Sequence, residues 1–413
     1  MSEIAHIPQL RFPEFSGEWE EKRLGDIADF SKGKGISKSD IDNDGQLECI
    51  RYGELYTTYN ELIKDVHSKT NIAKEDVKLS QIGDVIIPAS GETAIDIATA
   101  SCVLKDGVAI GGDLNIIRSD IDGVFNAYYL NNKNKYSVAR LSQGSSVIHL
   151  YAKHLETLKL NLPTKPEQTK IAAFLTEVDT KIEQLSKKQE LLGEYKKGLM
   201  QQIFSQVIRF KADDGSDFPD WEEKKLGGIG HTFNGLTGKT KDDFGRGKPY
   251  IQYMQIFESS KINIDNFGLV DVRDDENQKV AQYGDVFFTT SSETPDAVGY
   301  SSVLLDDIDK LYLNSFCFGF RPNSLDELSP NFAQFLLRSA NFRRRVVRLA
   351  QGSTRYNMSK VQLMKEVISL PCLKEQTKIA NFLSSIDTKI EQVGKQLDES
   401  KQFKKALLQQ MFV

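Results

Sequence analysis

The sequence predicts an α+β protein with a pseudo-two-fold internal repeat, in which two domains with twisted mixed β-sheets are joined by two long helices. Two observations support this prediction. Residues 162–204 and 370–412 align without a gap, and both contain the blocks EQTKIA and DTKIEQ. A weaker repeat precedes each copy, with WEEKRLG starting at Trp19 and WEEKKLG at Trp221. A duplicated scaffold that carries two divergent domains is the simplest interpretation.

Each of the two similar segments is predicted to form one long amphipathic helix. Positions that follow one another by steps of four and three residues form a heptad a/d register, and most of them are apolar. Pro163, Pro166 and Pro371 stand before the predicted helices, and no proline lies inside them. Two helices of one register, each following an equivalent domain, are expected to pair as an antiparallel coiled coil. The alternative is that each helix packs only on its own domain. The clearest positions of the seam are Ile171, Leu175, Val178, Ile182 and Leu185 in one segment and Ile379, Leu383, Ile386, Ile390 and Val393 in the other.

The chain is accordingly divided into a first domain at 1–161, a first helix with its linker at 162–216, a second domain at 217–369 and a second helix at 370–413. Short β-like runs and turns fill both domains, whereas helical stretches are few. Predicted strands lie at 84–87, 114–117, 285–288 and 316–320, and the clearest helices lie at 126–130 and 331–338.

The composition is that of an ordinary globular protein, with 39% hydrophobic residues in 413. No run is apolar enough to span a membrane, and the start lacks the basic and apolar regions of a signal peptide. The four cysteines lie far apart, which argues against a disulfide scaffold or a structural zinc site and fits a reducing compartment. We therefore expect a cytoplasmic protein that holds no metal.

The distribution of charge points to a polyanion. The net charge of −5 by itself argues against nucleic acid. Residues 329–365, however, contain no Asp or Glu, and neither do residues 123–155 at the equivalent place in the first half. Duplicated basic stretches without acids favour a shared nucleic-acid face. The alternative is an ordinary solvated surface.

Four loops at equivalent places carry side chains suited to DNA. They are SKGKGISKSD (31–40), NGLTGKTKDD (234–243), QGSSVIHLYAK (143–153) and QGSTRYNMSK (351–360). Backbone amides and hydroxyls bind phosphates, and Arg, Asn and Gln can read guanine and adenine in the major groove. Taken singly, each loop could equally be a surface turn.

Motifs for catalysis are missing. Gly238-Lys239-Thr240 resembles the end of a P-loop, but Phe233 stands where the motif requires glycine. No two prolines are adjacent, so the Pro-Pro-Tyr motif of amino-methyltransferases is absent, and no H-E-x-x-H occurs. The carboxylates near Pro219 are too close in sequence for a nuclease site. The sequence thus predicts recognition rather than reaction chemistry.

At this point the residues carry a family resemblance. FPEFSGEWEEKRLGDIA and FPDWEEKKLG at the domain openings, and LP-x-x-x-EQTKIA-x-FL-x-x-x-DTKIEQ at both ends, resemble the specificity subunit of type I restriction-modification systems. The resemblance implies two target-recognition domains, each reading one half of a bipartite, asymmetric DNA sequence, and helices that set the spacing. It also implies a non-catalytic role in bacterial defence. Two adenine-N6 methyltransferase subunits and motor-nuclease subunits would be the partners, and S-adenosylmethionine, ATP and Mg would bind those partners.

The resemblance indicates regions of DNA contact rather than single residues. In the first domain the candidates are Lys32, Lys34, Arg51, Tyr52, Ser90, Glu92, Thr93, Gln143, Ser145, Ser146, Tyr151 and Lys153. In the second they are Lys239, Gln252, Tyr253, Ser291, Ser292, Glu293, Thr294, Gln351, Ser353, Thr354, Arg355, Tyr356 and Asn357, with Arg343, Arg344 and Arg345 as phosphate contacts. Two rival interpretations stay open: a stand-alone nuclease or fused methyltransferase, and a repeat protein that binds only other proteins.

Overall fold

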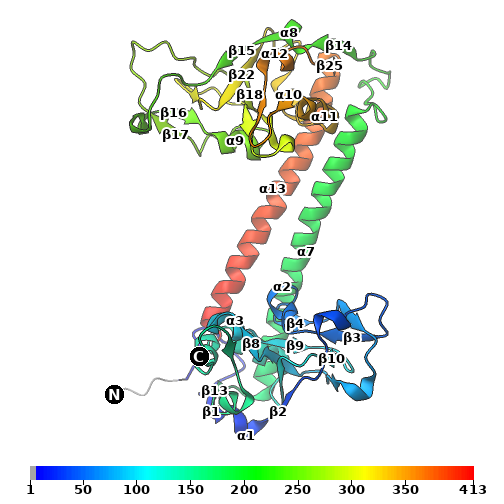
Figure 1. Ribbon diagram of the computed structural model, residues 1–413, viewed down its shortest axis with the longest axis vertical. Helices are drawn as coiled ribbons and strands as arrows, with labels where there is room; N and C mark the ends of the chain where they lie inside the picture. The colour runs from blue at the N-terminus through cyan, green and yellow to red at the C-terminus, as the bar shows by residue number, and fades with distance from the viewer. Residues whose placement is uncertain (1–5) are drawn as a thin grey trace. The chain divides into compact units, whose positions relative to one another are not determined.

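The computed structural model describes residues 6–413, which form two compact units. Unit 1 comprises the chain up to Ser186 together with Lys395–Val413, and unit 2 comprises Lys187–Gly394. Each unit therefore holds one α+β domain and one half of each long helix, α7 (Lys165–Phe204) and α13 (Leu373–Gln410) (Figure 1). The first five residues of the predicted first domain lie outside the described residues.

The main sheet of unit 1 is buried on both faces. Val85, Ile87 and Ile117 pack against α4 (Gly123–Asn131), whereas Ile86 and Ile116 face a second cluster on the other side. Burial of both faces explains the continuous apolar run of β7, where alternation is absent. The five strands run in the order β2 (Ala28–Lys32), β11 (Leu114–Ser119), β7 (Val85–Pro88), β9 (Ser101–Val103) and β4 (Leu62–Ile63), antiparallel except for the β4–β9 pair.

Smaller elements complete unit 1. A second mixed sheet has the order β5 (Ser68–Thr70), β3 (Leu47–Ile50), β10 (Ala109–Ile110) and β6 (Lys78–Leu79). Two antiparallel ribbons pair β1 (Glu20–Arg23) with β13 (Lys159–Leu162) and β8 (Ser90–Gly91) with β12 (Ile148–His149). Short helices are α1 (Leu24–Ile27), α2 (Glu54–Thr57), α3 (Ala94–Ile97), α5 (Lys135–Arg140), α6 (Ala152–Leu155) and the 3₁₀ turns at Lys38–Asp40 and Lys74–Asp76.

Unit 2 repeats this plan with a more aromatic core. Phe288, Phe318 and Phe320 of the main sheet are fully buried against Phe332 and Phe335 of α10 (Pro330–Leu336). The sheet order is β15 (Gly230–Asn234), β22 (Cys317–Pro322), β18 (Val286–Thr289) and β20 (Ser301–Val303).

The other elements of unit 2 also have counterparts in unit 1. Its smaller sheets are β17 (Gly268–Val270), β16 (Phe244–Ile251) and β21 (Tyr312–Leu313); β14 (Glu222–Lys225) with β25 (Val367–Leu370); and β19 (Ser291–Ser292), β24 (Tyr356–Met358) and β23 (Ala350–Gln351). The helices are α8 (Leu226–Ile229), α9 (Tyr253–Glu258), α11 (Ala340–Arg348), α12 (Lys360–Leu363) and the 3₁₀ turns at Lys241–Asp243 and Pro295–Ala297.

In each unit the two long helices run antiparallel and pack on each other. Ile171 and Leu175, near the start of α7, share a core with Leu407 and Met411, near the end of α13. Unit 2 shows the converse, because Ile203 near the end of α7 shares a core with residues at the start of α13. The same clusters include domain residues, so the helices pack both on each other and on the domain. The ten predicted seam positions are all buried or half-buried. The predicted fold class is confirmed.

The strand and helix predictions need small corrections. All four strands exist, but β7, β18 and β22 each begin one residue later than predicted. Phe316 consequently lies in the turn before β22 and not in the strand. Pro166 is the second residue of α7 and does not precede it, which the first turn tolerates because its backbone N–H groups have no intrahelical partner. No helix within residues 6–413 is both long and apolar enough to cross a membrane.

The repeated EQ pair ties α7 and α13 to their domains. Gln168 Oε1 accepts a hydrogen bond of 2.9 Å from the backbone N–H of Asp122, and its Nε2 donates to the carbonyl of Pro163. Gln376 makes the equivalent bonds to the N–H of Ser329 and the carbonyl of Pro371. Both glutamines are buried, and the bond that each Oε1 accepts from a distant backbone N–H exists only while helix and domain are docked.

Candidate nucleic-acid interface

Three strand ends of the main sheet meet at one edge in unit 1. Because β2 and β7 run antiparallel to β11, the end of β2 at Lys32, the end of β7 at Pro88 and the start of β11 at Leu114 lie side by side. We call this the loop edge of unit 1. The equivalent loop edge of unit 2 is defined by Asn234, Thr289 and Cys317. The Gly/Lys loops singled out in the sequence leave the sheets at these edges.

In unit 1 the segment QGSSVIHLYAK (143–153) and the turn Gly91-Glu92-Thr93 form one surface. β8 pairs with β12, so that Ser90 lies opposite His149. A bridge between Gln143 and His149 closes the hairpin, and the N–H of Leu150 donates to the carbonyl of Ala89 at 3.0 Å. Segments separated by about fifty residues of sequence thereby meet beside the loop edge.

Unit 2 builds the same surface from different side chains. Ser291 of β19 lies opposite Asn357 of β24, and Asn357 in turn lies opposite Gln351 of β23. Arg355, at the hairpin tip, donates a hydrogen bond from Nε to Ser291 Oγ at 3.2 Å. The backbone plan is shared by the two units, while the side chains that it carries differ.

Each hairpin tip turns on a glycine that no other residue can replace without strain. Gly144 has φ +131° and Gly352 has φ +136°. A Cβ atom would lie 2.1 Å from the carbonyl oxygen of Val147 in the first case and of Arg355 in the second. The shared Gln-Gly-Ser sequence therefore reflects a backbone requirement.

Most of the predicted contact residues are exposed. In unit 1 they are Lys32, Lys34, Tyr52, Glu92, Thr93, Gln143, Ser145, Ser146, Tyr151 and Lys153. In unit 2 they are Glu293, Thr294, Gln351, Ser353, Thr354, Arg355 and Asn357, together with Arg344 and Arg345 on α11. Arg51, Ser90, Gln252, Tyr253, Ser292 and Tyr356 are half-buried, and Ser291 is buried.

A hollow of about 710 Å³ in unit 1 brings four predicted residues together. Tyr52, Ser90, Glu92 and Ser146 line it with Tyr56. The Tyr56 hydroxyl donates to the carbonyl of Ser90 at 3.1 Å, and burial raises the pKa of this phenol, which therefore stays neutral. Aromatic faces beside a carboxylate and hydroxyls offer both stacking and hydrogen-bonding partners for a base.

Two of the residues predicted as cationic contacts bind groups of their own domain. The ammonium of Lys239 is bonded to Glu276 Oε1 at 2.6 Å and to the carbonyl of Asp271, and its side chain is only 6% exposed. Arg343 donates to three carbonyls, those of Asp296, Val298 and Gly299, and stacks 4.2 Å from the ring centroid of Tyr300. Both cations stabilise the second domain from within. For Arg343, the absence of nearby acids in the sequence did not reveal this role because its partners are backbone carbonyls.

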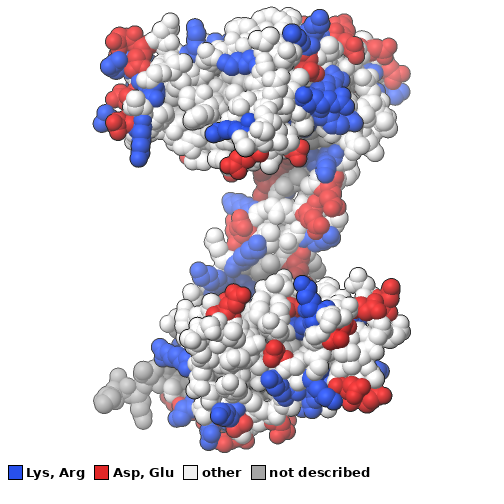
Figure 2. Space-filling model, in the orientation of Figure 1, with Lys and Arg blue, Asp and Glu red and all other residues white. Residues whose placement is uncertain are grey.

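Arg338, in the same basic stretch, is likewise internal. Its guanidinium donates to the carbonyls of Ser301, Ile256, Phe257 and Ser259, and burial lowers its pKa to about 10. The charge that reaches the surface comes from neighbouring positions on α11. Figure 2 shows Lys and Arg side chains gathered over this helix, where Arg344, Arg345 and Arg348 are exposed. Arg345 also donates to the carbonyl of Val367.

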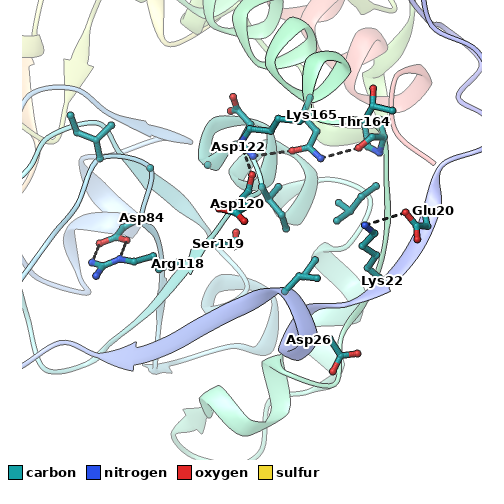
Figure 3. A pocket seen from close by; sticks show the side chains of 18 of the residues that line it. Glu20, Lys22, Asp26, Asp84, Arg118, Ser119, Asp120, Asp122, Thr164 and Lys165 are labelled. Carbon is teal, nitrogen blue, oxygen red and sulfur yellow. Dashed lines mark hydrogen bonds and ion pairs between the residues drawn. The ribbon is translucent and has the colours of Figure 1, made fainter.

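A second hollow of unit 1, of about 1050 Å³, lies at the opposite edge of the main sheet (Figure 3). It is lined by the start of β7 and the end of β11, where Asp84 accepts two hydrogen bonds from Arg118 at 2.6 and 2.7 Å. Other acids here are Glu18, Glu20, Asp26, Asp120 and Asp122. None of the predicted DNA contacts lines this hollow, and its excess of carboxylates does not suit phosphate.

No group of three or more His, Cys, Asp or Glu within residues 6–413 is placed to hold a metal ion. Burial raises the pKa of Cys102 and Cys317 to about 12, so these thiols stay protonated at neutral pH.

The sequence analysis overlooked residues of two kinds. Phe316 and Met254 are exposed hydrophobic residues of unit 2, and Phe316 lies at its loop edge. Arg11 and Arg209 bind the buried glutamates of the two EQTKIA blocks. The two arginines could have been found from the sequence, because the dipeptide Arg-Phe occurs upstream of both WEEK sequences.

Comparison with known proteins identifies the family of this chain. The profile of the family described as "Type I restriction modification DNA specificity domain" matches residues 16–192 and 219–399. The type I restriction enzyme MjaVIII specificity subunit of Methanocaldococcus jannaschii is 27% identical over 425 residues, which cover 97% of this chain and 92% of that protein.

Solved structures show the same fold at low sequence identity. The S subunit of a type-I restriction-modification system from M. genitalium superposes with a TM-score of 0.60 at 16% identity, covering 98% of this chain and 99% of that one. A chain from a study of complex assembly and conformational transition of the type I R-M system gives a TM-score of 0.53 at 19% identity, with 94% and 96% coverage.

Proposed function

Because this chain belongs to the type I restriction modification DNA specificity family, which recognises DNA targets, we propose how its two domains divide that task. Each domain is proposed to read one half of a bipartite, asymmetric sequence. The observation that supports the proposal is the duplicated loop edge. Both units present a glycine-turned hairpin against a short strand, at Ser90 and at Ser291, yet the exposed side chains of the two surfaces differ. Shared backbones with different polar side chains suit two different sets of base edges.

The two helices α7 and α13 are proposed to set the number of base pairs between the half-sites. Each helix takes part in both units, so the two readers are joined by a pair of continuous helices rather than by a flexible linker. Lengthening a continuous helix moves a domain by about 1.5 Å per residue and turns it by about 100°. Spacing between half-sites is then a property of helix length.

The chain is proposed to be non-catalytic and to act with partners in the cytoplasm. The sequence contains no adenine-methyltransferase motif and no P-loop, which supports the assignment of the chemistry to other subunits. Two adenine-N6 methyltransferase subunits that bind S-adenosylmethionine, and motor-nuclease subunits that use ATP and Mg, are the proposed partners.

Exchange of one domain tests the proposal. Residues 217–369 would be replaced by the second domain of a relative with a different target, and the chimera would be produced with the host's methyltransferase partner. Sequencing of methylated adenines in the genome should then show one changed half-site and an unchanged spacer and first half-site. Methylation by the purified chain without any partner, or a methylated motif without two parts, would contradict the proposal.

A further inference from the structure

Phe316 is an exposed aromatic residue in a turn whose backbone is fixed by hydrogen bonds. Its side chain is 59% exposed, although phenylalanine is usually buried. The N–H of Phe316 donates to Asn314 Oδ1 at 2.8 Å, and its carbonyl accepts from the N–H of Thr290 at 3.1 Å. The N–H of Cys317 donates to the carbonyl of Asn314 at 3.1 Å. The turn therefore leaves an apolar ring in contact with water, which is energetically unfavourable in the protein without a bound partner.

The ring stands at the loop edge of unit 2, beside the hairpin. Thr290, which binds the backbone of Phe316, also accepts a hydrogen bond of 2.9 Å from the N–H of Met358 in β24. The next residue along, Ser291, pairs with Asn357. Phe316 is thus joined through one residue to the surface formed by the QGSTRYN segment.

The matched position in unit 1 carries the opposite chemistry. Asp113 occupies the same place, because its carbonyl accepts from the N–H of Ala89 at 2.7 Å just as that of Phe316 accepts from Thr290. Asp113 is exposed and lies 4.0 Å from Lys32. One backbone position at the loop edge therefore presents a carboxylate in one reader and an aromatic ring in the other.

We propose that Phe316 contacts the 5-methyl group of a thymine in the half-site read by the second domain, and so determines specificity at that base pair. The proposal rests on the proposed function. Among the unmodified bases only thymine presents a methyl group in the major groove, and apolar side chains read it there. A ring without donors or acceptors would leave the polar edges of the other bases unsatisfied. Asn314 and Thr290, which bind the backbone of Phe316, are half-buried polar residues whose remaining side-chain groups can bond to neighbouring base edges.

Uracil substitution tests the contact, because uracil differs from thymine only by the missing methyl group. The bipartite motif would first be defined by methylation sequencing, and each thymine of the second half-site would then be replaced singly by uracil on either strand. Binding would be measured with the complex purified with its methyltransferase partner. For one thymine we expect about a fourfold loss of affinity, the effect of one methyl group removed from an apolar contact. The variant Phe316→Ala should bind the thymine and uracil duplexes equally.

A matched variant separates this contact from a general aromatic effect. Tyr283 is 41% exposed and precedes β18 at the opposite edge of the same sheet. Tyr283→Ala should keep the full preference for thymine. A wild-type series without a uracil effect, a second half-site without thymine on either strand, or an unchanged preference in Phe316→Ala would each overturn the inference. Sequence-specific binding would persist in those cases, whereas failure of the proposed function would abolish the bipartite motif itself.

Discussion

Arg11 donates two hydrogen bonds of 2.8 Å to the two carboxylate oxygens of Glu167, 156 positions away in the first turn of α7. Arg209 binds Glu375 of α13 in the same bidentate way, at 2.9 Å for both bonds. Both glutamates are almost completely buried, with side chains 1% and 0% exposed. The glutamate of each EQTKIA block thus ties the start of a long helix to the segment that leads into its domain.

Removing Glu167 should destabilise unit 1 strongly. The variant Glu167→Ala leaves the Arg11 guanidinium without its partner in a largely buried place, which costs on the order of 3 kcal/mol. Urea unfolding would measure the loss. Glu14→Ala is the matched control, because the Glu14–Lys170 pair lies exposed on the same unit and should contribute far less to stability. Equal effects of the two variants would contradict the assigned role.

The two residues of an ion pair between the long helices should depend on each other for their contribution to stability. Lys404 lies 2.8 Å from Asp179 in unit 1, and the equivalent residues Lys196 and Asp387 lie 2.5 Å apart in unit 2. Burial opposes the charge of Lys404, but Glu61 and Asp179 raise its pKa above the ordinary value. Lys404→Met should destabilise the fold, and adding Asp179→Asn should recover part of the loss. A double-mutant cycle should measure a coupling free energy of about 1–3 kcal/mol between Lys404 and Asp179. Strictly additive effects of the two substitutions would contradict a stabilising ion pair.

Neighbouring arginines of α11 should behave differently. Arg343→Ala removes three bonds to carbonyls and should lower the melting temperature of unit 2. Arg344→Ala should leave the melting temperature nearly unchanged because this side chain is exposed. If Arg344 contacts a phosphate, its loss should weaken binding to all sequences and reduce the salt slope by about one. If a stably folded Arg343→Ala protein showed a reduced salt dependence of DNA binding, Arg343 and not Arg344 would be the phosphate contact.

Glycine replacement at a hairpin tip should affect one half-site at a time. Gly352→Ala places a Cβ atom 2.1 Å from a carbonyl oxygen and should distort the hairpin of unit 2. Selection of bound duplexes from a random pool should then show a degenerate second half-site and an intact first one. Gly144→Ala is the matched change in unit 1 and should produce the converse pattern. Loss of both half-sites in either variant, with the fold intact by circular dichroism, would contradict independent reading.

The Lys239–Glu276 pair should make unit 2 sensitive to acid. The hydrogen bond from Lys239 holds the pKa of Glu276 at about 2, below the 4.5 of a free glutamate. A lowered carboxylate pKa stabilises the folded state above about pH 4.5, and this contribution is lost as the pH falls toward 2. Glu276→Gln should therefore melt earlier than the wild type at pH 7, and the difference should shrink below pH 4.5. Asp274→Asn, at a fully exposed residue, is the control and should have no such effect.

The repeat, the helix register and the strands of the main sheets could be predicted from the sequence because they depend on local patterns. A heptad seam or an apolar run such as 85–88 is legible within ten or twenty residues, since periodicity alone decides which face is buried. The Gln-Gly-Ser segments were recognisable for a similar reason, because a turn with positive φ selects glycine locally.

The tertiary structure decided which of the predicted contact residues are exposed. Arg343 and Arg344 are adjacent in one basic run, yet carbonyls of residues 296–299 bind the half-buried Arg343, whereas Arg344 is exposed. Ser90 and His149 became neighbours through strand pairing, and the carbonyl of Phe316 accepts a hydrogen bond from the N–H of Thr290 in a turn where the Phe316 side chain is exposed. Hydrogen bonding and burial between distant segments leave no periodic trace in the sequence, so the sequence alone determined the architecture, while the packing of the chain determined which polar and aromatic side chains are exposed.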